Sequence, residues 1–155
     1  MIMKYFADIL GASVLLIGVF LYIFLPTPEF QINKLQLQSL DGYPINLQKK
    51  DFILHIGSVE CLPCKRDTQV LMRYHYRYPE HTIIDANLLY QPQDIDSLIK
   101  WKRKLDIKYQ VAVIASSSTI YERIPTTFVF SNGTTTKLFG ALRYEALVEA
   151  THKDI

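Results

Sequence analysis

Two cysteines separated by two residues are the part of this chain best suited to chemistry. Cys61-Leu62-Pro63-Cys64 contains both cysteines of the 155-residue sequence. The motif follows a short apolar run, 51–57, and precedes a stretch with apolar residues at helical spacing, 65–78. At the start of a helix, unpaired N–H groups and the helix dipole favour a thiolate. Cys61 is therefore the predicted nucleophile and Cys64, nearly one turn later, the resolving thiol. Pro63 fits the first turn, where its missing N–H costs nothing.

Three other interpretations of the cysteine pair remain open. The first is an inert structural disulfide, although a bond across two residues closes so small a loop that it would constrain the chain little. His75 and His81 complete a C-x2-C-x10-H-x5-H pattern near zinc-finger spacing, but the middle gap is short and Pro79 separates the histidines. The third is a pair of core cysteines without a role. We expect no metal site, and no cofactor other than a redox-active disulfide between Cys61 and Cys64.

An apolar segment near the N-terminus predicts a membrane anchor. No charged residue interrupts Ile9–Leu25, and with its flanking aromatic residues the segment reaches the ~20 residues that a bilayer-spanning helix needs. The alternatives are a cleaved signal peptide and a buried terminal helix, but the run exceeds a signal-peptide core and no A-x-A site follows it. Pro26 and Pro28 end the helix. We assign residues 1–28 to a transmembrane anchor and linker, and 29–155 to one folded domain.

The distribution of charge predicts the orientation in the membrane and argues against nucleic acid as a partner. Lys4 precedes the apolar segment and Glu29 follows it, so the positive-inside rule leaves the N-terminus in the cytoplasm. The expected protein crosses the cytoplasmic membrane once, with its C-terminal domain outside, in the periplasm. The formal net charge is only +2, which does not suggest nucleic-acid binding. Five basic residues are interpreted as a solvated helix face, with anionic headgroups or an acidic partner as the alternative: Lys100, Lys102, Arg103, Lys104 and Lys108.

The order of apolar patterns after the anchor predicts an α/β fold. The expected strands are 31–39, a return strand from Ile45, 51–57, 82–86, 111–115, 126–130 and 137–142, and the expected helices are 65–78, 93–105 and 143–153. Asp41-Gly42 and Asn132-Gly133 mark tight turns between paired strands. Strands alternating with helices imply a parallel sheet covered on both faces, and the final hairpin makes the sheet mixed.

These motifs resemble the thioredoxin family. Phe52–Cys64 is similar to the strand, loop and CxxC of thioredoxins, and Arg123–Phe128 (RIPTTF) is similar to the loop that carries their cis-proline. With the anchor and the extra N-terminal strands, the resemblance is to the membrane-tethered TlpA type, which includes the thiol reductases of cytochrome c maturation. It covers roughly residues 35–150. It implies a thioredoxin-like mixed sheet flanked by helices, and a substrate strand pairing with the backbone at Ile124 and Pro125. From the residues alone, a cis and a trans Ile124–Pro125 bond are equally compatible.

Two residues depart from the thioredoxin pattern. The family usually has an aromatic residue before its first cysteine, whereas this chain has Glu60, whose carboxylate would disfavour a neighbouring thiolate. The family often has a buried acid six residues before that cysteine, and this chain has His55. Histidine titrates near neutral pH and could accept a proton from the second thiol. The alternative, which we favour, is a core histidine bonded to backbone.

The expected function is a thiol–disulfide oxidoreductase, reductase rather than oxidase. Its partners would be protein thiol or disulfide substrates and a membrane electron donor, with cytochrome c maturation or repair of extracytoplasmic thiols as candidate pathways. The second hypothesis is a non-catalytic thioredoxin-fold module for binding or assembly at the membrane, with Glu60 as the sign of lost catalysis.

Overall fold

The structure is a computed structural model that describes residues 32–47, 51–91, 94–115 and 123–152. The chain divides into two compact units, Met1–Phe30 and Gln31–Ile155, and every described residue belongs to the second. The predicted anchor, 1–28, lies outside the described residues and stays a prediction. Within the described ranges, no helix is both long and apolar enough to span a bilayer.

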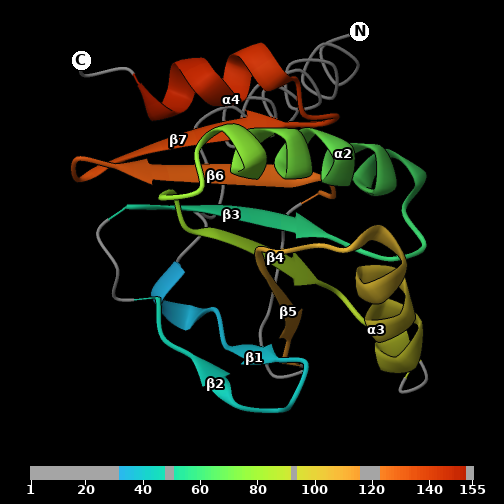
Figure 1. Cartoon of the computed structure of the whole chain (residues 1–155). Helices are drawn as coiled ribbons and strands as arrows, with labels where there is room; N and C mark the ends of the chain where they lie inside the picture. The colour runs from blue at the N-terminus through green and yellow to red at the C-terminus, as the bar shows by residue number, and fades with distance from the viewer. Residues whose placement is uncertain (1–31, 48–50, 92–93, 116–122, 153–155) are drawn as a thin grey trace, which may run out of the picture. The chain divides into compact units, whose positions relative to one another are not determined.

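The described strands form one seven-stranded mixed sheet in the order β2-β1-β5-β4-β3-β6-β7 (Figure 1). The strands are β1 (Leu37–Ser39), β2 (Pro44–Ile45), β3 (Phe52–Gly57), β4 (Ile83–Asn87), β5 (Gln110–Ile114), β6 (Thr126–Ser131) and β7 (Thr134–Phe139). β3, β4 and β5 are parallel neighbours, and the other pairs are antiparallel. The mixed sheet that the sequence predicts is confirmed, and β3, which leads into the cysteines, lies inside it.

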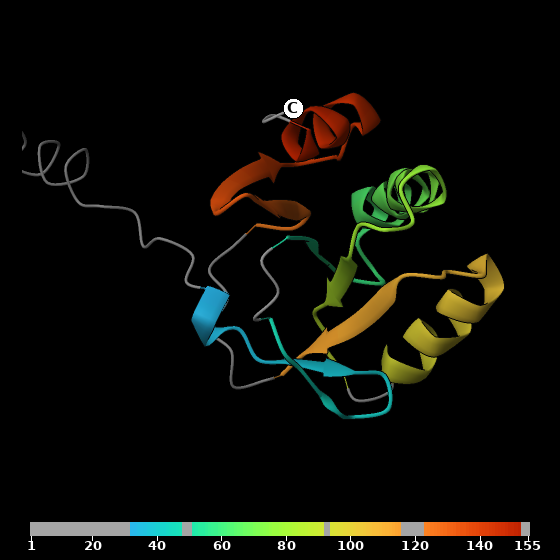
Figure 2. The ribbon, with the colours of Figure 1, turned by 60° about the vertical axis from the view of Figure 1, so that its left-hand side comes forward.

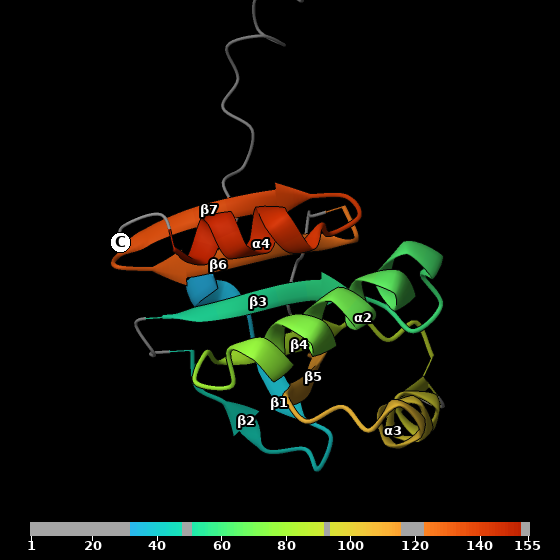
Figure 3. The same ribbon diagram turned by 45° about the horizontal axis from the view of Figure 1, so that its top comes forward.

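The three described α-helices cover the same face of the sheet. They are α2 (Leu62–Arg77), α3 (Asp94–Leu105) and α4 (Tyr144–Thr151), and a short 3-10 helix, η1, spans Ile32–Lys34. One core cluster contains Leu71 of α2, Leu98 of α3 and Leu147 of α4, and Figure 2 shows these helices along one side of the strands. Figure 3 shows α4 and α2 side by side over β6 and β3.

Among the described residues, this arrangement differs from the predicted helices on both faces. β3, β4 and β5 follow one another across the sheet without a change of direction. Each crossover between parallel strands is right-handed, so α2 and α3 must lie on the same face. The sequence pattern predicts the alternation of strands and helices, but the order of strands in the sheet decides which face each helix covers.

The register brings polar residues together under α2. His55 of β3 pairs with Asp85 of β4 on one side and with Thr127 of β6 on the other, and Gly57 pairs with Asn87. Because side chains alternate between the faces of a sheet, these residues face the same side. They therefore form a polar row across the centre of a sheet whose helix-covered face is otherwise apolar.

Two predicted strands have bounds that differ from the structure by more than one residue. Ile32–Lys34 is a 3-10 helix, so the first strand is only Leu37–Ser39. β7 begins earlier than predicted because Asn132 and Gly133 adopt φ values of 49° and 77°, a two-residue turn that pairs Ser131 with Thr134 at once. β7 also ends earlier, at Phe139, before Gly140 turns the chain with φ 73°.

Candidate active site

Cys61 and Cys64 form a disulfide at the start of α2. Their sulfurs are 2.07 Å apart and their Cα atoms 5.2 Å apart. Cys61 is the N-cap of the helix, and its Sγ accepts a hydrogen bond from the Cys64 amide at 3.2 Å. Cys61 is half-buried, whereas Cys64 is only 5% exposed. This asymmetry suits an attacking thiol that a second protein can reach and a resolving thiol that it cannot.

The helix begins at Leu62, three residues before the predicted start. Pro63 lies in the first turn, as predicted, and the Lys65 amide donates to the Cys61 carbonyl at 3.1 Å. The Leu-Pro dipeptide between the cysteines carries no helical periodicity, so the apolar pattern alone placed the start too late. The consequence for chemistry is direct, since the Cys61 sulfur lies at the positive end of the helix dipole.

The Ile124–Pro125 peptide bond is cis, as the resemblance implies. Pro125 is buried, and its carbonyl accepts a hydrogen bond from the Gly140 amide at 3.1 Å. Thr126, the next residue, pairs with Ile56 of β3. Pro125 therefore lies at the same end of the sheet as Gly57. The role of Ile124 and Pro125 in holding a substrate strand stays a prediction.

Gly57, the last residue of β3, lies directly against the resolving cysteine. A Cβ at this position would be 3.1 Å from Cys64 Cβ and 3.3 Å from Cys64 Sγ. The same point is 3.2 Å from His55 Nε2. Glycine suits this close approach of helix and strand, because a Cβ here would press the Cys64 side chain and the imidazole back by a few tenths of an ångström.

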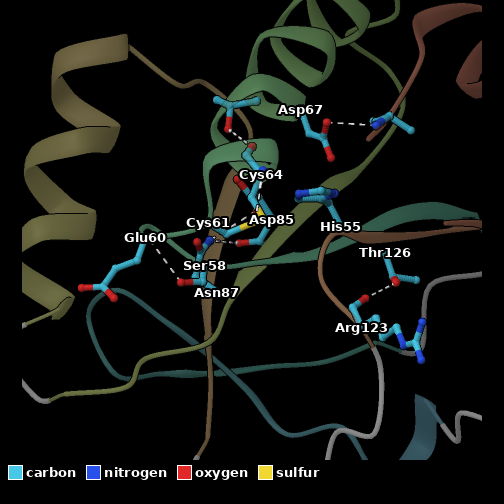
Figure 4. The surroundings of a disulfide bond; sticks show 12 residues. His55, Ser58, Glu60, Cys61, Cys64, Asp67, Asp85, Asn87, Arg123 and Thr126 are labelled. Carbon is cyan, nitrogen blue, oxygen red and sulfur yellow. Dashed lines mark hydrogen bonds between the residues drawn. A yellow bond between two sulfur atoms is a disulfide. The ribbon is translucent and has the colours of Figure 1, made fainter. Parts of the chain in front are cut away.

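His55 is fully buried beside the disulfide (Figure 4). Its Nδ1 lies 3.0 Å from Thr127 Oγ1, and its Nε2 has no hydrogen-bond partner among the described residues. Burial lowers the pKa of His55 from 6.5 to about 4, since the charged ring would lose its hydration. His55 is a core residue, as favoured, but its partner is a hydroxyl side chain and not the backbone.

Two buried acids share the same region, and the sequence analysis did not single them out. Burial raises the pKa of Asp85 to about 7 and that of Asp67, on α2, to about 6. Hydrogen bonds oppose these shifts, from Asn87 to Asp85 and from the Leu142 amide to Asp67. The sequence signal that could have found Asp85 is a charge inside the apolar run TIIDA, because burying an acid costs free energy and such groups cluster at functional sites.

Glu60 is exposed, and its side chain points away from the disulfide (Figure 4). Its amide donates to Ser58 Oγ at 3.2 Å. The predicted restraint of the Cys61 thiolate by this carboxylate stays a prediction, and the geometry makes the expected effect small.

The histidines of the zinc interpretation have other surroundings. His81 Nδ1 lies 2.5 Å from the Tyr74 hydroxyl, and the His75 ring meets Tyr109 edge-on. Across the described ranges, no three His, Cys, Asp or Glu side chains are grouped so that they could hold a metal ion.

The sheet order, the cysteines at the start of α2 and the cis-proline before β6 together define the architecture. The fold is thioredoxin-like. No known protein family and no curated protein matches the chain by sequence. Solved structures match it: a secreted Mycobacterium tuberculosis disulfide oxidoreductase homologous to E. coli DsbE has 15% identity and a TM-score of 0.64, covering 77% of this chain and 97% of that one.

Two further structures share the fold. A putative thiol:disulfide interchange protein DsbE from Chlorobium tepidum has 18% identity and a TM-score of 0.62, covering 74% of this chain and 88% of its own. StoA from Bacillus subtilis has 20% identity and a TM-score of 0.60, covering 74% and 93%. Matches of this kind are thiol:disulfide oxidoreductases, and this chain has its Cys-x-x-Cys pair at disulfide distance.

Proposed function

We propose that this protein is a thiol–disulfide oxidoreductase that reduces protein disulfides, with Cys61 as the attacking thiol and Cys64 as the resolving thiol. The observation that carries the proposal is the half-buried Cys61 at the N-cap of α2, joined by a disulfide to the buried Cys64. The reduced Cys61 thiolate attacks a substrate disulfide and forms a mixed disulfide. Cys64 then attacks Cys61 Sγ, the internal disulfide re-forms, and the substrate leaves as a dithiol.

The proposed location is the outer side of the cytoplasmic membrane. Ile9–Leu25 would span the bilayer as a single helix, and Lys4 favours a cytoplasmic N-terminus. A secreted disulfide oxidoreductase of M. tuberculosis shares the fold. A membrane electron donor would return electrons to the Cys61–Cys64 disulfide, and cytochrome c maturation is the candidate pathway. Protein disulfides would be the substrates.

The test is insulin reduction by the full-length chain in detergent micelles with dithiothreitol as the electron source. Wild type should accelerate the reaction, and Cys61→Ser and Cys64→Ser should not. Tyr76→Phe is a matched control, because this side chain is 90% exposed on α2 and away from the disulfide. A wild-type chain without activity would contradict the proposal and favour a non-catalytic binding module, for which Glu60 in place of an aromatic residue is the supporting feature.

The reduction potential of the Cys61–Cys64 pair decides the direction of electron flow. A value near the ~−270 mV of thioredoxin would support a reductant, and a value near ~−120 mV would contradict it in favour of an oxidant. The measurement is equilibration of the full-length chain with glutathione buffers, followed by alkylation of the free thiols.

A further inference from the structure

A groove of about 330 Å³ lies between the C-terminal half of α2 and the end of α3. Its walls include Met72 and His75 from α2, and Leu105, Asp106, Lys108 and Tyr109 from the end of α3 and the segment that follows it. Because α2 leads to β4 and α3 to β5, which are parallel neighbours, the two helices end at the same edge of the sheet. Figure 2 shows them on one side of the strands. The groove is therefore remote from the disulfide, since Cys64 and His75 are separated by about 16 Å along the helix.

The walls of this groove offer apolar surface to a partner. Met72 and Leu105 are half-buried and pack against the edge of the hydrophobic core. Tyr109 is buried, and the His75 ring meets it edge-on with the ring centroids 5.9 Å apart. A thioether adapts to side chains of different shapes. The groove has the size of a small binding pocket, with room for one large apolar side chain.

The helices that form the groove are strongly basic. α2 and α3 carry four Lys or Arg residues each, eight of the 17 in the chain. Of their three acids, Asp67 and Asp94 are buried, and only Asp96 is exposed. Removing these residues from the totals of 17 and 15 leaves nine basic and twelve acidic residues for the rest of the chain. The excess of positive charge therefore belongs to these two helices.

Neither ion pairs nor the helix dipoles balance this positive charge. Within the described ranges, no Lys or Arg of α2 or α3 forms an ion pair. Four of these cations lie in the last turns of the two helices, near the groove: Arg77, Lys102, Arg103 and Lys104. A helix C-terminus is equivalent to about half a negative charge, so the two helix ends balance about one of the four. About three positive charges near the groove stay uncompensated.

A partner that fits this surface must supply negative charge and an apolar group together. An anionic membrane surface would meet the cations, but a flat bilayer would leave the groove between the helices unfilled. A protein segment with one large apolar side chain among Asp and Glu residues supplies both, because its carboxylates and its apolar side chain can engage at the same time.

We infer that this groove docks an acidic segment of a partner protein. A large apolar side chain of the segment enters between Met72 and Leu105, and its carboxylates meet Arg103 and Lys104. This docking surface lies beyond the thiol chemistry of the proposed function, at the opposite end of α2 from Cys61. A partner held here leaves Cys61 uncovered, so recognition and disulfide exchange use separate surfaces.

Fluorescence anisotropy with labelled peptides tests the groove and the charge separately. The oxidised full-length chain in uncharged detergent micelles is titrated into Glu-Asp-Glu-Phe-Glu-Asp-Glu and two matched peptides, one with Ala in place of Phe and one with Lys in place of every acid. The phenylalanine peptide should bind about ten-fold more tightly than the alanine peptide, as burial of one large apolar side chain implies, and the lysine peptide should not bind. Equal binding of the phenylalanine and alanine peptides would overturn the inference in favour of a surface that attracts any polyanion, anionic lipid included.

Reversing two exposed charges on α3 tests the basic surface. Arg103→Glu combined with Lys104→Glu should weaken binding of the phenylalanine peptide by about ten-fold or more. The matched control, Lys34→Glu combined with Arg143→Glu, changes the net charge equally at exposed positions outside both helices. At ~0.15 M salt, where the Debye length is ~8 Å, the control should change the affinity by less than about three-fold. Equal losses from the two pairs would overturn the inference.

Met72→Glu tests the groove itself. A carboxylate in the groove should repel the peptide and weaken its binding by about ten-fold or more. Gln69→Glu is the matched control, because it adds the same charge at an exposed position one turn earlier on α2, and it should change the affinity by less than about three-fold. Far-UV circular dichroism checks that Met72→Glu is folded. A folded Met72→Glu chain that binds the peptide as wild type does would overturn the inference.

The failure of this docking site and the failure of the proposed function are distinguishable. Peptide binding by the oxidised chain involves no free thiol. A wild-type chain that binds the phenylalanine peptide but does not reduce insulin would overturn only the proposed function, and one that reduces insulin without binding the peptide would overturn only the docking site. Sedimentation velocity tests the remaining occupant. Dimerisation that Arg103→Glu with Lys104→Glu abolishes, without peptide binding, would assign the groove to a second copy of the chain and overturn the inference.

Discussion

Replacing Asp85 with asparagine should stabilise the folded chain at alkaline pH. Asp85 is buried, only 2% exposed, in the central region of the sheet. Asparagine has nearly the same shape, carries no charge and keeps an oxygen for the hydrogen bond from Asn87. The substitution therefore removes the cost of a buried carboxylate without opening a cavity.

The pKa of Asp85 sets the size and sign of the effect. It is 3.8 in the unfolded chain and about 7 in the folded one, where desolvation disfavours the ionised form. The folded state thus binds this proton more tightly. The stability that protonated Asp85 contributes to the folded state is fully present below pH 3.8 and is lost as pH rises through 7. Between pH 5 and pH 8 the loss for this group is about 3 kcal/mol.

Urea unfolding of the oxidised full-length chain at pH 5 and pH 8 measures this effect. The advantage of Asp85→Asn over wild type should be larger at pH 8 by about 3 kcal/mol. Comparing the variant with wild type at the same pH cancels the direct contributions of the other titratable groups to the stability. Asp67, with a pKa of about 6, also lowers the stability as pH rises. His55 has the opposite effect, because its contribution is lost as pH falls from 6.5 to about 4. Asp67→Asn, the control, should show a smaller gap. An advantage of Asp85→Asn that is equal at both pH values would refute the reasoning.

Three further predictions concern the cysteines and their neighbours. Cys64→Ser should accumulate mixed disulfides through Cys61 in non-reducing gels, whereas Cys61→Ser should accumulate few; equal trapping would contradict the assignment. Gly57→Ala should destabilise the chain by about 1–2 kcal/mol in urea unfolding, because its Cβ would lie 3.1 Å from Cys64 Cβ; unchanged stability would show that helix and strand separate easily. Glu60→Gln should change the iodoacetamide rate of Cys61 by less than about two-fold at moderate salt, since the carboxylate points away, and a ten-fold change would show that it reaches the thiolate.

The sequence alone determined the local features of the site. Cys61 and Cys64 lie between an apolar strand and an amphipathic helix, and that order places one sulfur at a helix N-cap whatever the remaining fold. Asn132-Gly133 likewise specifies its hairpin, because few other dipeptides accept positive φ at two successive positions. Resemblance, and not the residues themselves, gave the cis bond before Pro125.

Only the tertiary structure decided what lies under the resolving thiol. His55, Asp85 and Thr127 come from strands that are up to 72 residues apart in sequence, and they meet because β4 and β6 both pair with β3. No periodicity encodes which strand neighbours which, since strand order arises from the packing of the whole sheet. The same packing removes water from these groups, and that desolvation moves their pKa values away from the ordinary ones.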